Sequence, residues 1–244
     1  MRVVAVVQAR MGSTRLPGKV MMPLAQRPMI HHVVVRAQRI PGVDEVVVAI
    51  PRGPREQPLA QYLRTVLRVP VVVGDEEDVL ARYWEAAARF SADAVVRITG
   101  DCPLLSPRVS GQVVQAFLGA PAEVDYASNT LVRTYPRGLD TEIFSVEALE
   151  KAHSEARRAS DREHVTSYLY GRPQGFRLLA VRGKAALADH RWTVDTQADY
   201  ELAWRIFEAL HHRDPLFELD QVLALLQRYP WWSKLNGGFC PGRP

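Results

Sequence analysis

The first half of the chain repeats one pattern, in which a short run of β-branched apolar residues alternates with a segment of helical spacing. The apolar runs cover residues 3–7, 45–50, 69–73 and 94–98. The segments 28–40, 59–67, 78–90 and 107–118 place apolar residues three and four positions apart, as amphipathic helices do. Nearly continuous Val and Ile runs between such helices are typical of parallel strands buried on both faces. The pattern therefore predicts an α/β fold, with a mostly parallel central sheet and helices on both faces.

The second half of the chain is less regular. We expect strands at 125–128, 176–181 and 192–194, and helices at 145–158, 160–170, 197–210 and 219–228. No internal repeat or low-complexity linker divides the chain. The simplest organisation is one domain over residues 1–228 with an irregular insert near 126–190. A tail at 229–244, which contains Pro, Gly and Trp without periodicity, follows it.

Composition excludes several classes of protein. The chain has 244 residues, 47% of them hydrophobic and 24% charged, as in ordinary globular proteins. No apolar run approaches the roughly 20 residues that span a bilayer, and the N-terminus lacks a signal-peptide pattern. Cys102 and Cys240 cannot form a disulfide framework, so we expect a reducing, cytoplasmic setting. The 31 basic and 27 acidic residues are scattered, so we expect no nucleic-acid partner.

The most informative segment is the loop 8–19, QARMGSTRLPGK, which directly follows the first predicted strand. Its glycines permit close backbone approach to a ligand, and its cations Arg10, Arg15 and Lys19 can neutralise phosphates. It is not a Walker A loop, because five residues separate Gly12 from Gly18 and a valine follows the lysine. The GxGxxG dinucleotide fingerprint is absent as well. We therefore predict a phosphate-binding loop of another kind.

Two aspartates each follow a predicted strand. Asp101 lies in RITGDCPLL and Asp195 in RWTVDTQADYEL. Asp101 has a simpler interpretation, as the cap of a turn before a proline. Thr196 and Asp199 match a helix capping box, which leaves Asp195 without a structural role. Ligands of α/β sheets bind at the carboxyl ends of strands, so two carboxylates beside a cationic loop predict a magnesium–triphosphate site.

A third group of polar residues lies in PRGLDTEIF and SDREHVT. Asp140 and Glu142 alternate on a predicted short strand and so share one face, where they either bind sugar hydroxyls or are solvated. Arg162 and His164 share a helical turn and could face an anionic substrate, although a structural histidine fits equally. A capping box is predicted for the helix that begins at Ser160, with its acidic partner three residues later.

These segments together resemble the cytidylyltransferases that activate sugar acids such as acylneuraminate and 3-deoxy-manno-octulosonate. Within them, the pattern is most similar to the branch of spore coat polysaccharide biosynthesis protein F. The resemblance extends from residue 3 to about residue 207. It is carried by QARMGSTRLPGKV, GDEEDVLARYWEAA, VVRITGDCPLL, PRGLDTEIFSVEALEKA, REHVT and RWTVDTQADYEL.

The resemblance implies a Rossmann-like nucleotide-diphospho-sugar transferase fold, a homodimer, and Mg²⁺ held by Asp101 and Asp195. The implied reaction moves CMP from CTP onto a hydroxyl of a sugar or sugar acid, with release of pyrophosphate, for surface polysaccharide or glycan synthesis. The implied catalytic residues are Lys19, Arg15, Asp101 and Asp195. The implied contacts to the CTP phosphates are Arg10, Ser13, Arg15 and Lys19. We expect further nucleotide contacts at Ala9, Gly12, Arg97 and Gly100. The acceptor contacts that we expect from the residues themselves are Asp140, Glu142, Arg162 and His164.

Two alternatives stay open at the level of sequence. One is a nucleotidyltransferase that uses another base or another acceptor, such as a sugar 1-phosphate or a phosphonate. The other is a nucleotide-sugar-binding glycosyltransferase, or a non-catalytic partner in polysaccharide assembly. Base selection usually rests on backbone groups and pocket shape, so the cytidine preference is implied by the resemblance alone.

Overall fold

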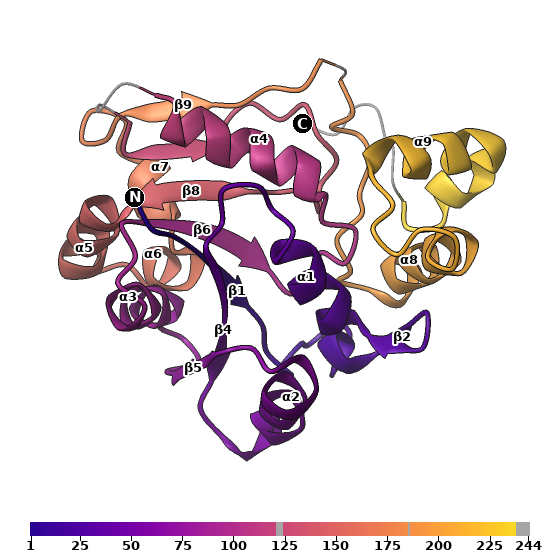
Figure 1. The fold of residues 1–244 in the computed structure, drawn as a ribbon, viewed down its shortest axis with the longest axis horizontal. Helices are drawn as coiled ribbons and strands as arrows, with labels where there is room; N and C mark the ends of the chain where they lie inside the picture. Colours follow the sequence, from indigo (N-terminus) through magenta and orange to yellow (C-terminus); the bar gives the residue numbers. More distant parts are fainter. Residues whose placement is uncertain (121–123, 185, 238–244) are drawn as a thin grey trace.

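A seven-stranded sheet forms the centre of the molecule (Figure 1). The computed structural model describes residues 1–120, 124–184 and 186–237; Cys240 and the end of the tail lie outside them. Strands β1 (Val3–Gln8), β4 (Glu45–Pro51), β5 (Val71–Gly74) and β6 (Ala94–Thr99) are parallel, in the order β5-β4-β1-β6. These are the four strands predicted for the first half of the chain.

The second half of the chain extends the same sheet. Strand β8 (Glu142–Ser145) is antiparallel to β6, β7 (Tyr126–Ser128) is antiparallel to β8, and β9 (Leu178–Ala180) is parallel to β7. Among the strands of this sheet that the structure describes, β8 is the one whose direction is opposite to that of the others. The predicted α/β class and mostly parallel sheet are therefore confirmed.

Helices cover both faces of the sheet. Alternate residues of β1 face opposite sides, so Val3, Ala5 and Val7 belong to one apolar core. Helices α1 (Met29–Ala37), α2 (Gln57–Tyr62) and α4 (Pro107–Leu118) close that core. Val4 and Val6 belong to the core on the other side, under α3 (Val79–Arg89), α5 (Val146–Glu155) and α7 (Ser167–Tyr170).

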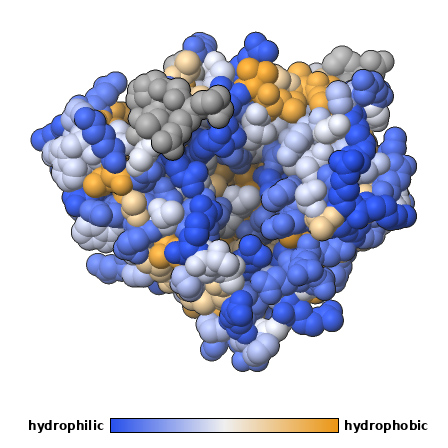
Figure 2. Space-filling model, turned by 180° about the vertical axis from the view of Figure 1, so that it is seen from behind, coloured by the Kyte–Doolittle hydropathy of each residue, from blue (hydrophilic) through white to orange (hydrophobic). Residues whose placement is uncertain are grey.

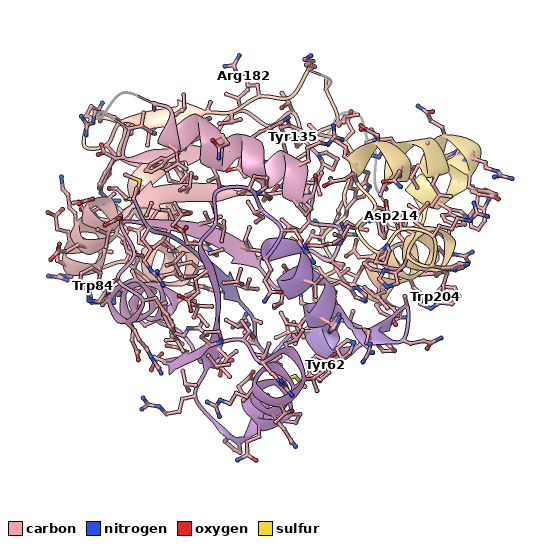
Figure 3. All side chains as sticks on the ribbon, viewed as in Figure 1. Tyr62, Trp84, Tyr135, Arg182, Trp204 and Asp214 are labelled. Carbon is pink, nitrogen blue, oxygen red and sulfur yellow. The ribbon has the colours of Figure 1, made fainter. Side chains whose placement is uncertain are left out.

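Aromatic and cationic contacts join elements that are distant in sequence. Trp84 of α3, labelled in Figure 3, is partly buried. Its ring stacks on His153 of α5, with ring centroids 5.7 Å apart. On the other side, the buried Arg36 of α1 donates to the carbonyl of Phe217 at 2.9 Å, and its guanidinium lies 4.4 Å from the ring centroid of the same residue. These contacts fix α3 and α1, the helices that flank the central strands.

A third apolar core lies at one end of the sheet. It joins the two-residue strands β2 (Pro23–Leu24) and β3 (Arg27–Pro28) to α8 (Gln197–Leu210) and α9 (Leu219–Arg228). The short helix η4 (Pro230–Lys234) completes this core through the buried Trp232. The start of the predicted tail is therefore packed against the body of the protein. No helix among the described residues is long and apolar enough to cross a membrane.

Several boundaries in the second half differ from those predicted. The predicted helix 160–170 is two helices, α6 (Ala159–His164) and α7, because Val165 between them has a positive φ of 60°. The capping box predicted at Ser160 is absent, since that residue already lies inside α6 and no side chain caps this helix. The predicted strand 192–194 is not a strand: an isolated bridge pairs Arg137 with Arg191, directly before this segment, and the chain bends at Thr193. Asp140 precedes β8, so it does not share a strand with Glu142.

Replacing Gly138 with alanine is expected to lower the free energy of unfolding by about 2 to 4 kcal/mol. Its φ is +104°, and a Cβ there would lie 2.6 Å from the backbone nitrogen of Thr193, so left-handed strain and a backbone clash add. Urea unfolding measures the change. Gly237→Ala is the matched control, because Gly237 has a φ of +64° and no neighbour within 4 Å. Equal losses in the two variants would contradict the clash at Gly138.

Candidate functional site

A cavity of about 230 Å³ opens where β1 and β6 end. This is the edge at which ligands bind in parallel sheets. The rear face of the molecule is hollowed near its middle between largely hydrophilic residues (Figure 2). The cavity is lined by ten of the residues singled out from the sequence, which come from several separate segments: Ala9, Arg10, Gly12, Ser13, Arg15, Lys19, Gly100, Asp101, His164 and Asp195.

The loop after β1 is held in shape by backbone hydrogen bonds to one carbonyl. The amides of Ser13 and Gly18 donate to the carbonyl of Met11 at 3.1 and 3.0 Å. The Met11 amide in turn donates to the carboxylate of Glu56 at 2.9 Å. Gly18 has a φ of 70°, a left-handed conformation that glycine adopts without strain, and it opens the turn that begins with Lys19. These hydrogen bonds fix the backbone of the loop near Met11 and near Gly18, and Arg15 lies between these two points.

Lys19 lies between the two aspartates predicted to form the site. Its Nζ donates to Asp101 Oδ2 at 2.8 Å, to Asp195 Oδ1 at 2.9 Å and to the carbonyl of Val194 at 2.8 Å. Burial alone would lower the pKa of Lys19, but attraction by Asp101 and hydrogen bonds to both carboxylates outweigh burial and raise it. The structure thus places three of the predicted site residues, Lys19, Asp101 and Asp195, in direct contact.

Asp195 is surrounded by cations. Besides Lys19, Arg15 lies 3.0 Å from Oδ1 and Arg191 lies 2.6 Å from Oδ2. Burial would raise the pKa of Asp195, but the hydrogen bonds and charges of Lys19, Arg191 and Arg15 hold it below its usual value. The carboxylate therefore stays ionised at lower pH than a free aspartate does, as a cation site requires.

The capping box predicted at Thr196 and Asp199 is present and positions Asp195. Thr196 Oγ1 accepts from the Asp199 amide at 3.3 Å, and Asp199 Oδ2 accepts from the amides of Thr196 at 2.9 Å and Asp195 at 3.0 Å. A buried structural carboxylate thus fixes the backbone of the residue that contacts Lys19.

Acid is expected to destabilise the protein through Asp199. Burial would raise its pKa, but hydrogen bonds from Asn236 and from the backbone of Asp195 and Thr196 lower it. A depressed native pKa adds stability that is present above the unfolded-state pKa of about 3.9 and is lost as the pH falls below it. Between about pH 5 and pH 3, the wild type should therefore lose more free energy of unfolding than Asp199→Asn. Urea midpoints measure this, and equal losses would contradict the depressed pKa of Asp199.

Arg82 is a residue of this cavity that the sequence analysis did not single out. It is only 3% exposed, and its Nε and Nη1 find no hydrogen-bond acceptor among the described residues. Burial lowers its pKa. A Cβ on Gly74 would lie 2.6 Å from the Arg82 side chain, so that glycine makes room for it. The sequence signal was present, because Val79, Arg82 and Tyr83 share the apolar face of α3, where an arginine is unusual.

A second cavity, of about 460 Å³, adjoins the first and shares Thr99 and His164 with it. It contains the predicted acceptor residues Asp140, Glu142 and His164. Arg97, expected to contact the nucleotide, also lies here and not in the first cavity. The remaining lining residues are Thr130, Leu131, Arg133, Thr166 and Tyr170.

Arg162, expected to face the substrate, is directed elsewhere. Its guanidinium donates to Asp78 Oδ2 at 2.5 Å and to the carbonyl of His153 at 2.8 Å, and it lines neither the first nor the second cavity. These contacts tie α6 to α3 and α5. Arg162 is therefore structural in this conformation, whereas its neighbour His164 lies at the junction of the cavities.

The sheet order and a cationic loop at the carboxyl ends of its strands define a nucleotidyltransferase-type α/β protein. Comparison with solved structures agrees: a cytidylyltransferase from Leptospira borgpetersenii is similar with a TM-score of 0.90 and 29% identity, over 95% of this chain and 96% of that one. A CMP:2-keto-3-deoxy-manno-octonic acid synthetase, solved in complex with CTP, shares the fold with a TM-score of 0.64 and 21% identity, over 86% of this chain and 99% of that one.

The chain belongs to the cytidylyltransferase family, whose sequence model matches residues 4–227. It is 31% identical to an uncharacterized protein of Methanocaldococcus jannaschii, over 97% of this chain and 95% of that protein. It is 28% identical to spore coat polysaccharide biosynthesis protein SpsF of Bacillus subtilis, over 92% of this chain and 94% of the relative. The family expected from the sequence motifs is therefore confirmed.

Proposed function

We propose that this protein transfers the cytidylyl group of CTP to a hydroxyl of a sugar-type acceptor and releases pyrophosphate. The observation that carries the proposal is Lys19, whose ammonium is held between Asp101 and Asp195 beneath a cationic loop. The CTP complex of the structurally similar synthetase supports the choice of nucleotide. The name of the Bacillus subtilis relative supports a role in surface polysaccharide synthesis.

The first cavity is the proposed site of the triphosphate. Arg10 and Arg15 are about half exposed and available to a ligand, with side-chain exposures of 48% and 60%. The buried Arg82 supplies two unsatisfied donors, which an anion would satisfy. Charge-assisted hydrogen bonds from these arginines would bind the phosphates and stabilise the charge of the leaving pyrophosphate. Lys19, whose three N–H groups donate to Asp101, Asp195 and the carbonyl of Val194, would add its positive charge.

The donor set also fits a divalent cation such as Mg²⁺. Asp101 and Asp195 both contact the Lys19 ammonium, so the two carboxylates lie close enough to share one cation. A divalent ion held by the same two oxygens would take the place that the Lys19 ammonium has in this structure. Protein Mg²⁺ sites commonly use one or two carboxylates together with substrate phosphates. The described residues contain no cluster of three or more metal-ligating side chains, so the phosphates would have to complete the coordination. When bound, the ion would neutralise phosphate charge in the reacting complex.

The second cavity is the proposed acceptor site, because it meets the first at Thr99 and His164. The acceptor hydroxyl oxygen forms a bond to the α-phosphorus, and the bond from that phosphorus to the pyrophosphate oxygen breaks. The hydroxyl proton is released to solvent. In such transfers the protein acts mainly by positioning the reactants and stabilising charge. Asp101, Asp195, Arg15 and Lys19 are the proposed catalytic residues.

We also propose that residues 1–228 act as one nucleotidyltransferase domain, because β7, β8 and β9 of the insert extend the central sheet. The homodimer implied by the resemblance stays a prediction, which light scattering on the full chain would test.

The proposed reaction can be tested before the acceptor is identified. The protein is incubated with CTP, Mg²⁺ and a small-molecule extract of its source cells, and pyrophosphate is measured together with new nucleotide conjugates by mass spectrometry. A CMP conjugate that forms with stoichiometric pyrophosphate supports the proposal. A UMP, GMP or AMP conjugate formed from the matching triphosphate would reject cytidine, and pyrophosphate without a conjugate would reject transfer.

Replacing Lys19 with alanine is expected to weaken CTP binding by about tenfold or more, because the change removes a positive charge from the phosphate site and leaves Asp101 and Asp195 without the cation that they share. Calorimetric titration of CTP in the presence of Mg²⁺ measures the dissociation constant. Lys184→Ala, a change outside the first cavity, serves as the control and should leave the constant unchanged. An unaltered affinity in Lys19→Ala would remove the loop from the nucleotide site.

A further inference from the structure

The segment that follows α9 and η4 reaches the candidate site. Leu235 packs against the third apolar core, in which α8 and α9 lie side by side (Figure 1). The amide nitrogen of the next residue, Asn236, donates to the carbonyl of Arg191 at 2.8 Å and to Asp199 Oδ1 at 2.9 Å. A carbonyl and an ionised carboxylate can only accept hydrogen bonds, so both contacts need the N–H groups of the amide. Asn236 therefore joins two residues that contact Asp195.

The two carboxylate oxygens of Asp199 have different partners. Oδ2 accepts from the backbone amides of Asp195 and Thr196. Oδ1 accepts from Asn236 and, at the longer distance of 3.3 Å, from Arg191 Nε. The Asp199 side chain is only 2% exposed, so water cannot easily replace a lost donor. Oδ1 therefore depends on the side chains of Asn236 and Arg191.

Arg191 is shared between two carboxylates. Its Nη2 donates to Asp195 Oδ2 at 2.6 Å, whereas its Nε donates to Asp199 Oδ1. Because Arg191 occupies Oδ2 of Asp195, the other oxygen, Oδ1, contacts Lys19 at 2.9 Å and Arg15 at 3.0 Å. Arg191 thus determines which oxygen of Asp195 faces the cations of the loop after β1.

Loss of the Asn236 amide would change how Arg191 is shared. Asp199 Oδ1 would keep only the arginine as a donor, and a buried carboxylate with too few donors attracts a cation strongly. The guanidinium would then move toward Asp199 and away from Asp195. Without a partner on Oδ2, the Asp195 carboxylate can rotate, and its Oδ1 is no longer held against Lys19.

We infer that Asn236 is a positioning residue, which holds the Asp195 carboxylate in the orientation that directs Oδ1 to Lys19. The segment after residue 228 then completes the site of the domain proposed above. The importance of this orientation for catalysis rests on the proposed function, which uses Asp195 as a ligand of the divalent cation. Asn236 acts on the site only through Arg191 and Asp199.

The Lys19 ammonium allows a test without any nucleotide or metal. The chain has four lysines, so nitrogen-15 labelling of lysine gives few side-chain NMR signals, and Lys19→Arg identifies the signal of Lys19. Its hydrogen-bonded protons should exchange slowly with water in the wild type. Asn236→Ala should accelerate this exchange by about tenfold or more, because one charge-assisted hydrogen bond contributes at least that factor. Asn236→Asp keeps the shape but lacks the donors, so its effect should be at least as large.

Val222→Ala is the matched control. Val222 lies on α9 and is buried in the third apolar core, so its truncation loosens that core without removing a side-chain hydrogen bond. The melting temperature should fall, while the exchange rate at Lys19 stays within about twofold of that in the wild type. Unchanged exchange in Asn236→Ala, or an equal acceleration in Val222→Ala, would overturn the inference.

Calorimetric titration of CTP at a series of Mg²⁺ concentrations tests what the positioning does for the proposed function. Removing a group that holds a metal ligand by hydrogen bonds typically lowers metal affinity by roughly 10- to 100-fold. In Asn236→Ala, the Mg²⁺ concentration that gives half of the maximal gain in CTP affinity should therefore rise by about tenfold or more. An unchanged Mg²⁺ dependence would overturn the role of Asn236 at the cation site. A wild type that does not bind CTP would reject the proposed function, whereas the exchange rates at Lys19 still decide whether Asn236 positions Asp195.

Discussion

Replacing Asp101 with asparagine is expected to lower turnover by about 10²-fold or more while the protein stays folded. The carboxylate of Asp101 is one of the two that position Lys19, and it is one of the two oxygen ligands proposed for the divalent cation. Asparagine has nearly the same shape as aspartate but lacks the charge. It therefore weakens the contact with Lys19 and the proposed contact with the divalent cation, both of which lie where charge develops in the reaction. Initial rates of pyrophosphate release measure the effect, and the melting temperature verifies the fold.

Asp220→Asn is the matched control for this experiment. Asp220 lies on α9, its side chain is 73% exposed and its partner is Arg108, so its amide variant should retain full turnover. Near-normal turnover in Asp101→Asn, in the same assay, would exclude Asp101 from the mechanism.

Replacing Glu142 with alanine should have the largest effect on stability, with a loss of about 3 to 5 kcal/mol in the free energy of unfolding. The change leaves Arg97, whose side chain is only 17% exposed, without its countercharge and removes the acceptor of the Tyr126 and Thr166 hydroxyls. Asp140→Ala removes the partner of Arg133 in a pair whose side chains are 20% and 35% exposed, and should cost only about 1 kcal/mol. Urea unfolding of the two variants measures the contrast.

The double variant Arg97→Met, Glu142→Leu distinguishes a buried charge from a general packing defect. Removing both charges should recover much of the stability that Glu142→Ala loses, because no uncompensated ion remains. A Glu142→Ala protein within about 1 kcal/mol of the wild type would show that the Arg97–Glu142 pair is solvated.

Local patterns predicted the first half of the fold well. Continuous apolar runs between segments of helical spacing located β1, β4, β5 and β6, because these strands are buried on both faces and their helices are amphipathic. The strand-end rule then placed the loop at Lys19 and the carboxylate of Asp101 together. The capping box at Thr196 was also visible in the sequence, since it depends on residues three positions apart.

Features that depend on tertiary contacts could not be predicted from these patterns. The break at Val165 is a positive φ at a β-branched residue, which local propensity disfavours. The partner of Arg162 is 84 residues away, and the partner of Arg97 is 45 residues away. A single sequence does not report which carboxylate each arginine meets, so Arg97 was assigned to the nucleotide and Arg162 to the acceptor. Arg82 was overlooked although its place on an apolar helix face was a usable signal.

The most direct test of the central claim is calorimetric titration of the wild-type protein with CTP, UTP, GTP and ATP, each with and without Mg²⁺. The family assignment predicts that CTP binds at least about tenfold more tightly than the others, equivalent to roughly 1.4 kcal/mol, and the proposed cation site predicts that removal of Mg²⁺ weakens CTP binding. A ligand whose free concentration is 100 times its dissociation constant raises the free energy of unfolding by about 2.7 kcal/mol. The resulting increase in melting temperature therefore verifies the titration. Tighter binding of another nucleotide, or no binding of CTP, would contradict the assignment of this cavity to CTP.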